Sequence, residues 1–258
     1  MIIKNTHEEW QSQKYLNILD VSNFVFDKKA SLIHAFSWWY YLIQKLHGAA
    51  MGRAYTERKF WDGFAGRYDS FIKRLKPTYD LIIEKTRNTI EPSEDVLEIA
   101  TGTGIITLAI ADKARTVTGC DISPEMIKVA QKKLEESRLD NVSFSVEDAY
   151  NLGFDDAAYD VAIASNTLHV MMHPGEALRS VHRVLKPGGI LIAPTYCHGN
   201  SIFTRMVSAI MSIVGFRAHQ KWSTGSFKDF IQTNGFDIVT FEIIHDLIPL
   251  VFAVARKK

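Results

Sequence analysis

Three acidic side chains and one glycine-rich loop are the residues of this chain whose types and spacing could do chemistry. Glu98, Asp121 and Asp148 lie in or at the ends of three short segments that read as strands, and the loop at residues 100–104 reads Ala-Thr-Gly-Thr-Gly. Glycine lets a backbone approach a ligand closely, and the start of a helix offers free N–H groups. Three carboxylates in register beside such a loop indicate a nucleoside ligand that carries an amine.

Each carboxylate has a role that its position suggests. Glu98 stands inside an apolar stretch, where it can orient the glycine loop or accept a hydrogen bond from an ammonium group. Asp121 follows Gly102 by about 20 residues, the spacing of an acid that holds ribose hydroxyls. Asp148 could accept from an exocyclic amine. The third glycine of the dinucleotide fingerprint is missing, because Thr107 occupies its place.

The elements that must position these residues alternate between strand and helix from Asp95 onward. Short apolar segments predict five strands, at residues 96–100, 116–120, 142–146, 159–164 and 190–195. Helices are expected between them, one of them capped by Ser123. This order predicts a parallel, doubly wound sheet whose ligands bind beyond the carboxyl ends of the strands. Two further strands, at 236–244 and 247–255, are joined too tightly for a crossover and must be antiparallel, which gives a seven-stranded α/β fold.

Two segments fall outside this alternation. Residues 1–55 are predicted to form a helical, aromatic-rich N-terminal cap; two alternatives for residues 31–46 are a dimer face and a segment that lies on a membrane surface. Residues 56–90 read as two helices with Phe-Ala-Gly-Arg-Tyr-Asp, residues 64–69, between them. An insertion at about 197–222 contains an apolar helix that is either core or a lid over a substrate.

Composition limits the classes of function. The 258 residues suffice for one α/β domain, here expected at 56–258, with an appendage, and the net charge of +1 gives no reason to expect nucleic acid as a partner. Cys120 and Cys197 form neither a disulfide framework nor a metal pattern, so no metal is expected. No secretory signal and no apolar run of the roughly 20 residues that span a membrane is found. The expected location is cytoplasmic, with membrane contact limited to the periphery.

The stretch from Asp95 to Tyr196 resembles the class I S-adenosylmethionine-dependent methyltransferases. The matching motifs are Val-Leu-Glu-Ile-Ala-Thr-Gly-Thr-Gly, Cys-Asp-Ile-Ser-Pro-Glu-Met, Val-Glu-Asp-Ala, Tyr-Asp-Val-Ala-Ile-Ala-Ser-Asn-Thr-Leu-His and Arg-Val-Leu-Lys-Pro-Gly-Gly-Ile-Leu. Their order and spacing are most similar to the small-molecule group that includes the ubiquinone and menaquinone methyltransferases. The resemblance implies a Rossmann-like fold, S-adenosyl-L-methionine as cofactor and S-adenosyl-L-homocysteine as product.

The resemblance also implies cofactor-binding roles for residues that match the family pattern. These are Tyr68, Glu98, Ala100, Thr101, Gly102, Gly104, Asp121, Ile122, Asp148, Ala149 and Asn166. Glu98 and the loop would hold the methionine part, Asp121 the ribose and Asp148 the adenine amine, with Ile122 and Ala149 near the base. Tyr68 would close over the cofactor. Ala100 departs from the family, which most often has glycine there.

The implied reaction is in-line displacement of the sulfonium methyl group by a nucleophile, which asks the protein mainly for positioning and desolvation. His169 is the first candidate for a general base, ahead of His173 and His198. The expected acceptor is a small, hydrophobic molecule that is quinone-, lipid-, amine- or thiol-like. Two alternatives stay open. The chain could be a catalytically silent interaction module that binds S-adenosylmethionine, or a nicotinamide-dependent oxidoreductase, which the missing glycine disfavours.

Overall fold

The computed structural model describes residues 52–197, 218–245 and 248–258. Arg53–Lys258 form a compact unit of their own. Most of the N-terminal cap, most of the insertion at 197–222 and His198 lie outside the described residues, so those expectations stay predictions. In the described part, no helix is both long and apolar enough to cross a membrane.

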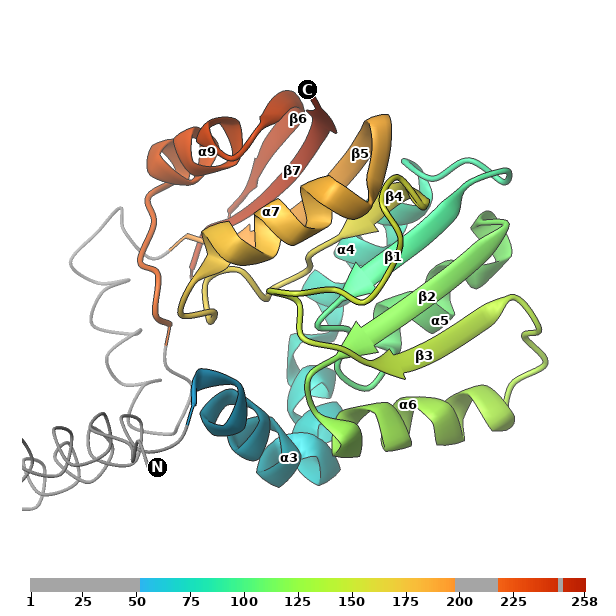
Figure 1. The fold of residues 1–258 in the computed structure, drawn as a ribbon. Helices are drawn as coiled ribbons and strands as arrows, with labels where there is room; N and C mark the ends of the chain where they lie inside the picture. Colours follow the sequence, from blue (N-terminus) through green and yellow to red (C-terminus); the bar gives the residue numbers. More distant parts are fainter. Residues whose placement is uncertain (1–51, 198–217, 246–247) are drawn as a thin grey trace, which may run out of the picture. The chain divides into compact units, whose positions relative to one another are not determined.

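A seven-stranded sheet forms the centre of this unit, with the strand order β3-β2-β1-β4-β5-β7-β6 (Figure 1). The strands are β1 (Asp95–Ile99), β2 (Thr116–Asp121), β3 (Val142–Val146), β4 (Tyr159–Ile163), β5 (Leu185–Tyr196), β6 (Phe236–Ile244) and β7 (Leu250–Lys257). Strands β1 to β5 pair in parallel, and β7 runs antiparallel between β5 and β6. The predicted doubly wound sheet with an antiparallel C-terminal hairpin is therefore confirmed.

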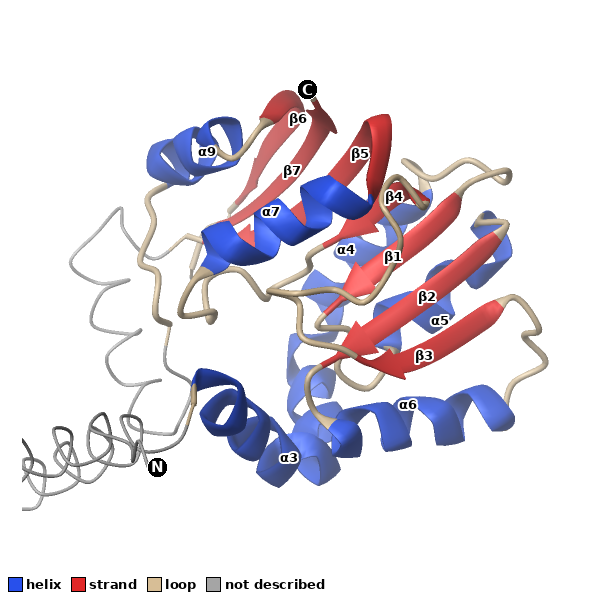
Figure 2. Cartoon of the chain, viewed as in Figure 1, coloured by secondary structure: helices blue, strands red, loops and turns tan. Residues whose placement is uncertain are grey.

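Helices cover both faces of the sheet (Figure 2). They are α3 (Arg53–Ile72), α4 (Lys76–Arg87), α5 (Ile105–Ile110), α6 (Pro124–Glu135), α7 (Pro174–Val184) and α9 (Thr224–Thr233), with single 3-10 turns at Lys73–Leu75 and Ala111–Lys113. The start of α6 is capped as predicted, because the Ser123 hydroxyl accepts from the backbone N–H of Met126 at 3.1 Å.

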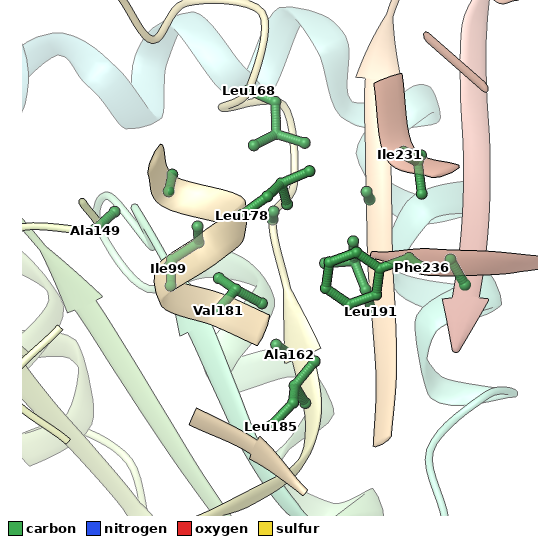
Figure 3. Close-up of a cluster of buried hydrophobic side chains, with 14 of the residues drawn as sticks. Ile99, Ala149, Ala162, Leu168, Leu178, Val181, Leu185, Leu191, Ile231 and Phe236 are labelled. Atoms are coloured by element: carbon green, nitrogen blue, oxygen red, sulfur yellow. The ribbon is translucent and has the colours of Figure 1, made fainter. Parts of the chain in front are cut away.

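Two hydrophobic cores lie against the two faces, since successive side chains of a strand point to opposite sides. On one face, Ile99 and Leu191 pack with Leu178 and Val181 of α7 and Ile231 of α9 (Figure 3). On the other face, the β1 residue Val96 packs in a cluster with residues of α4 and α5. The central strands β1 and β4 are buried on both sides, and the pairing of β1 with β2 and of β2 with β3 brings the carboxyl ends of β1 to β4 together.

Two sequence predictions about element boundaries are wrong. Residues 64–69 do not separate two helices, because α3 runs without interruption from Arg53 to Ile72. A single glycine, Gly66, lowers helix stability without ending the helix. Strand β5 starts at Leu185 and not after the Lys-Pro-Gly-Gly turn, because Leu185 already pairs with Tyr159 and the sheet takes up the turn as an irregularity.

Candidate cofactor site

The loop after β1 folds around the carboxylate of Glu98. Its Oε2 accepts from the Thr101 hydroxyl at 2.7 Å and from the Thr107 backbone N–H at 3.0 Å, and also from the Thr107 hydroxyl. Glu98 is 3% exposed, and this burial raises its pKa to about 7. Of the two roles predicted for Glu98, the contacts favour orienting the loop. Thr107, which replaces the third fingerprint glycine, supplies two of these hydrogen bonds.

Three residues of this loop adopt left-handed backbone angles, namely Ala100 (φ 50°), Gly102 (φ 58°) and Gly104 (φ 75°). Two features require glycine at position 104: its left-handed φ, and the ring of Phe144, which would lie 2.6 Å from a Cβ there. Ala100 occupies a conformation that costs an ordinary L-residue about 1–2 kcal/mol. The backbone at position 100 thus has a left-handed φ that glycine would adopt with less strain than alanine.

Asp121, at the end of β2, connects the loop after β1 with the turn that follows β2. Its Oδ2 accepts from the Gly102 N–H and its Oδ1 from the Ser123 N–H, both at 2.9 Å. Burial raises its pKa to about 6, although both backbone hydrogen bonds oppose the rise. Each carboxylate oxygen keeps a second lone pair, so Asp121 can still accept from a pair of ligand hydroxyls.

Asp148, in the loop after β3, is held from two sides. Its Oδ1 accepts from the Tyr150 N–H at 3.0 Å, and its Oδ2 accepts from the Arg53 guanidinium at 2.5 Å. The neighbouring Ala149 is buried. The carboxylate that the sequence assigns to an exocyclic amine is thus oriented by a helix that precedes the sheet.

That helix, α3, is anchored on the loops beyond the carboxyl ends of the strands. The ring of Tyr68 lies 3.4 Å from the position that a Cβ on Gly102 would occupy. Asp62 accepts from the Ser123 hydroxyl at 2.6 Å, and Asp69 accepts from the Thr103 hydroxyl at 2.6 Å. Figure 1 shows α3 beyond the arrowheads of β2 and β3. The ring of Tyr68 therefore lies next to the glycine loop, and its predicted role of closing over the cofactor stays a prediction.

One pocket brings the predicted residues together at the carboxyl ends of β1 to β4. Predicted residues on its wall are Tyr68, Ala100, Gly102, Asp121, Ile122, Asp148, Ala149 and Asn166. Glu98, Thr101 and Gly104 are not among the described lining residues; Glu98 and Thr101 are linked by a hydrogen bond that supports the loop. Asn166 has a left-handed φ of 51°, a backbone state that asparagine tolerates better than most residues and that recurs at functional sites.

Sequence reasoning missed other residues of the pocket wall. These are Glu57, Trp61, Met126, Glu147, Tyr150, Ser165, Thr167, Val170 and Met171. Glu57 and Trp61 lie one helical turn apart and within three turns of Tyr68, so a continuous α3 places them on one face. The mistaken break at residues 64–69 concealed this face.

His169, the predicted base, is buried and is not among the described lining residues, although Thr167 and Val170 on either side of it are. Its ring centroid lies 6.0 Å from that of Tyr196, and its carbonyl oxygen accepts from the Gln220 N–H at 2.9 Å. His173 sits at the start of α7, near the ring of Tyr150. A general-base role for His169 stays a prediction.

Comparisons with known proteins agree with this geometry. Residues 97–193 match the family described as "Methyltransferase domain". The demethylmenaquinone methyltransferase of Corynebacterium kroppenstedtii is 32% identical over 150 residues, which cover 55% of this chain and 62% of that protein. The ubiquinone/menaquinone biosynthesis C-methyltransferase UbiE of Ectopseudomonas mendocina is 35% identical over 122 residues, or 45% of this chain and 48% of that protein.

Among solved structures, a SAM-dependent methyltransferase of Aquifex aeolicus superposes with a TM-score of 0.58 at 19% identity. The match covers 73% of this chain and 98% of that one, and it shows the shared fold. The chain spans about half the length of the relatives it matches in sequence. Residues 97–193 therefore carry a methyltransferase domain, which resembles the class I, S-adenosylmethionine-dependent domains of the ubiquinone and menaquinone methyltransferases.

Proposed function

We propose that this chain transfers a methyl group from S-adenosyl-L-methionine to a small, hydrophobic acceptor. The observation that carries the proposal is the convergence of Gly102, Asp121, Asp148 and Asn166 on one pocket at the carboxyl ends of the parallel strands. This edge is where doubly wound sheets bind nucleosides. The likeness to quinone methyltransferases adds independent support from sequence.

The residues present fit the cofactor. Gly102 leaves a cradle over which Tyr68 lies, and a side chain at position 102 would fill it. Asp121 is held by two backbone N–H groups in an orientation that leaves lone pairs for ribose hydroxyls. Asp148 would accept from the adenine amine, and Asn166 would lie beside the methionine part. When bound, S-adenosylmethionine supplies an electrophilic methyl group, so the protein's task is to align the acceptor and exclude water.

The acceptor is proposed to be an apolar, quinone-like ring. Trp61, Val170 and Met171 contribute apolar surface to the same pocket that holds the carboxylates. Pockets for small molecules combine such surface with a few polar groups that fix orientation. The two relatives are named for reactions in menaquinone and ubiquinone biosynthesis, one of them as a C-methyltransferase. His169 is kept as the proposed base for a proton that the acceptor must lose.

A transfer assay tests both parts of the proposal. The full chain is incubated with S-adenosylmethionine labelled in the methyl group and a metabolite extract, and the products are divided into organic, aqueous and precipitated fractions. Label in the organic phase is expected and would support a quinone-like acceptor. Label in the precipitate would overturn the small-molecule assignment. Cofactor binding without transfer, even to an added demethylated quinol, would favour the silent interaction module.

A further inference from the structure

A closed ring of contacts ties the first turn of α3 to the loop after β3. Arg53 donates through Nη2 to Asp148 Oδ2 at 2.5 Å and through Nη1 to Glu57 Oε2 at 2.8 Å. The Tyr150 hydroxyl donates to the other oxygen of Glu57 at 3.1 Å, and the Tyr150 N–H donates to the other oxygen of Asp148 at 3.0 Å. The ring thus joins four residues that are separated by up to 97 positions in sequence, from Arg53 to Tyr150.

The guanidinium group of Arg53 also lies over the ring of Tyr150 in this loop. Its Cζ is 3.6 Å from the centroid of the Tyr150 ring. The side chain is 23% exposed, so solvent screens the ion pairs only in part. A planar fork that bridges two carboxylates while stacking on an aromatic face is a geometry available to arginine and not to lysine.

The partners of Arg53 line the pocket, whereas Arg53 is not among the described lining residues. Glu57, Asp148 and Tyr150 all contribute to the wall. Arg53 therefore acts on a ligand through the groups it holds. Without it, Asp148 keeps a hydrogen bond on only one of its oxygens among the contacts described.

We infer that Arg53 is a positioning residue for nucleobase specificity: it holds the Asp148 carboxylate and the Tyr150 ring in the arrangement that selects a base with an exocyclic amine. The inference rests on the proposed cofactor site. A carboxylate fixed at this rim accepts from the amine of adenine and repels the carbonyl oxygen that replaces the amine in hypoxanthine. A carboxylate free to rotate discriminates less, because it can turn toward water.

The test measures the dissociation constants of S-adenosylhomocysteine and S-inosylhomocysteine by calorimetry. The full chain is compared with Arg53→Gln, Arg53→Lys and Arg115→Gln. Arg115 also pairs with an aspartate, Asp95 at the start of β1, but at the amino ends of the strands, away from the pocket, so Arg115→Gln is the control. Since a hydrogen bond to a charged acceptor changes affinity by about tenfold to a hundredfold, wild type should prefer the adenine compound at least tenfold.

In Arg53→Gln this preference is expected to fall to about threefold or less, because the adenine compound loses more affinity than the inosine compound. Arg53→Lys should behave like Arg53→Gln, and Arg115→Gln like wild type. A merely structural role would weaken both ligands equally and leave the ratio unchanged, which would overturn the inference. So would a wild-type ratio in Arg53→Lys. Failure of wild type to bind S-adenosylhomocysteine would instead refute the proposed cofactor site itself.

Discussion

The buried carboxyl group of Glu98 predicts a specific dependence of stability on pH. The folded protein raises the pKa of Glu98 from 4.5 to about 7, chiefly by burial, with a contribution from the nearby charge of Asp121. The folded state therefore holds this proton more tightly than the unfolded state. Stability that is present below pH 4.5 is lost as the pH rises toward 7 and the buried carboxylate must ionise. A shift of that size corresponds to about 3 kcal/mol.

Glu98→Gln removes the ionisation and keeps an oxygen that can accept from the Thr107 N–H and the Thr101 hydroxyl. We expect the free energies of unfolding of variant and wild type to be similar near pH 4. Between pH 4.5 and 8, the variant should gain about 3 kcal/mol relative to wild type. The buried Asp121 titrates in both proteins, so its contribution cancels to first order.

Urea denaturation followed by circular dichroism, without cofactor and at intervals from pH 4 to 8, measures this difference. Glu125→Gln, at an exposed site in the first turn of α6, is the control and should give a curve parallel to wild type. Parallel curves for Glu98→Gln and wild type would refute the reasoning, because they would show that Glu98 ionises as easily in the folded protein as in the unfolded chain.

Three further substitutions test the geometry of the loops. Asp121→Ala should weaken S-adenosylmethionine binding at least about tenfold in calorimetry. It should also lower the free energy of unfolding by about 2 kcal/mol, because the buried N–H groups of Gly102 and Ser123 lose their acceptor. Ala100→Gly should raise the free energy of unfolding by about 0.5 kcal/mol, because relief of the left-handed strain at φ 50° slightly exceeds the entropic cost of glycine. A lower free energy of unfolding, measured by urea denaturation, would contradict this expectation. Gly104→Ala should lower it by about 2 kcal/mol or more, since it combines a φ of 75° with a Cβ placed 2.6 Å from an aromatic carbon. An unchanged thermal midpoint for Gly104→Ala would show that the loop relaxes freely.

The strand positions and the carboxylates at their ends were predictable from sequence because both are local features. Short segments rich in β-branched and apolar residues mark the strands, and acidic residues mark their ends: Asp121 is the last residue of β2, and Asp148 follows β3 by two positions. The alternation with helices then leaves few topologies, because crossovers between parallel strands are right-handed. The cradle of Gly102 and Gly104 followed from residue type, since glycine is the residue best suited to such backbone angles.

The contribution of α3 to the pocket was not predictable in the same way. Tyr68 of α3 was expected from the family resemblance, but the other two pocket-lining residues of this helix, Glu57 and Trp61, were not. They lie far in sequence from the strands that they meet, and no local pattern states which loop a helix will cover. The predicted break at residues 64–69 added to this error, because it interrupted the helical periodicity that places residues 57, 61 and 68 on one face. The same limit applies to Arg53, whose partner Asp148 is 95 positions away.

Sequence alone thus determined the fold class, the glycine-rich loop and the carboxylates at the strand ends, because hydrophobic periodicity and residue type specify these features within a few neighbouring positions. Tertiary structure alone decided how those groups are used. In the folded chain, Glu98 accepts hydrogen bonds from Thr101 and Thr107 of the loop. Asp121 is buried and accepts from two backbone N–H groups, and Arg53 donates to Asp148. Hydrogen bonds and burial of this kind depend on which distant segments meet, and only the packed chain brings those segments together.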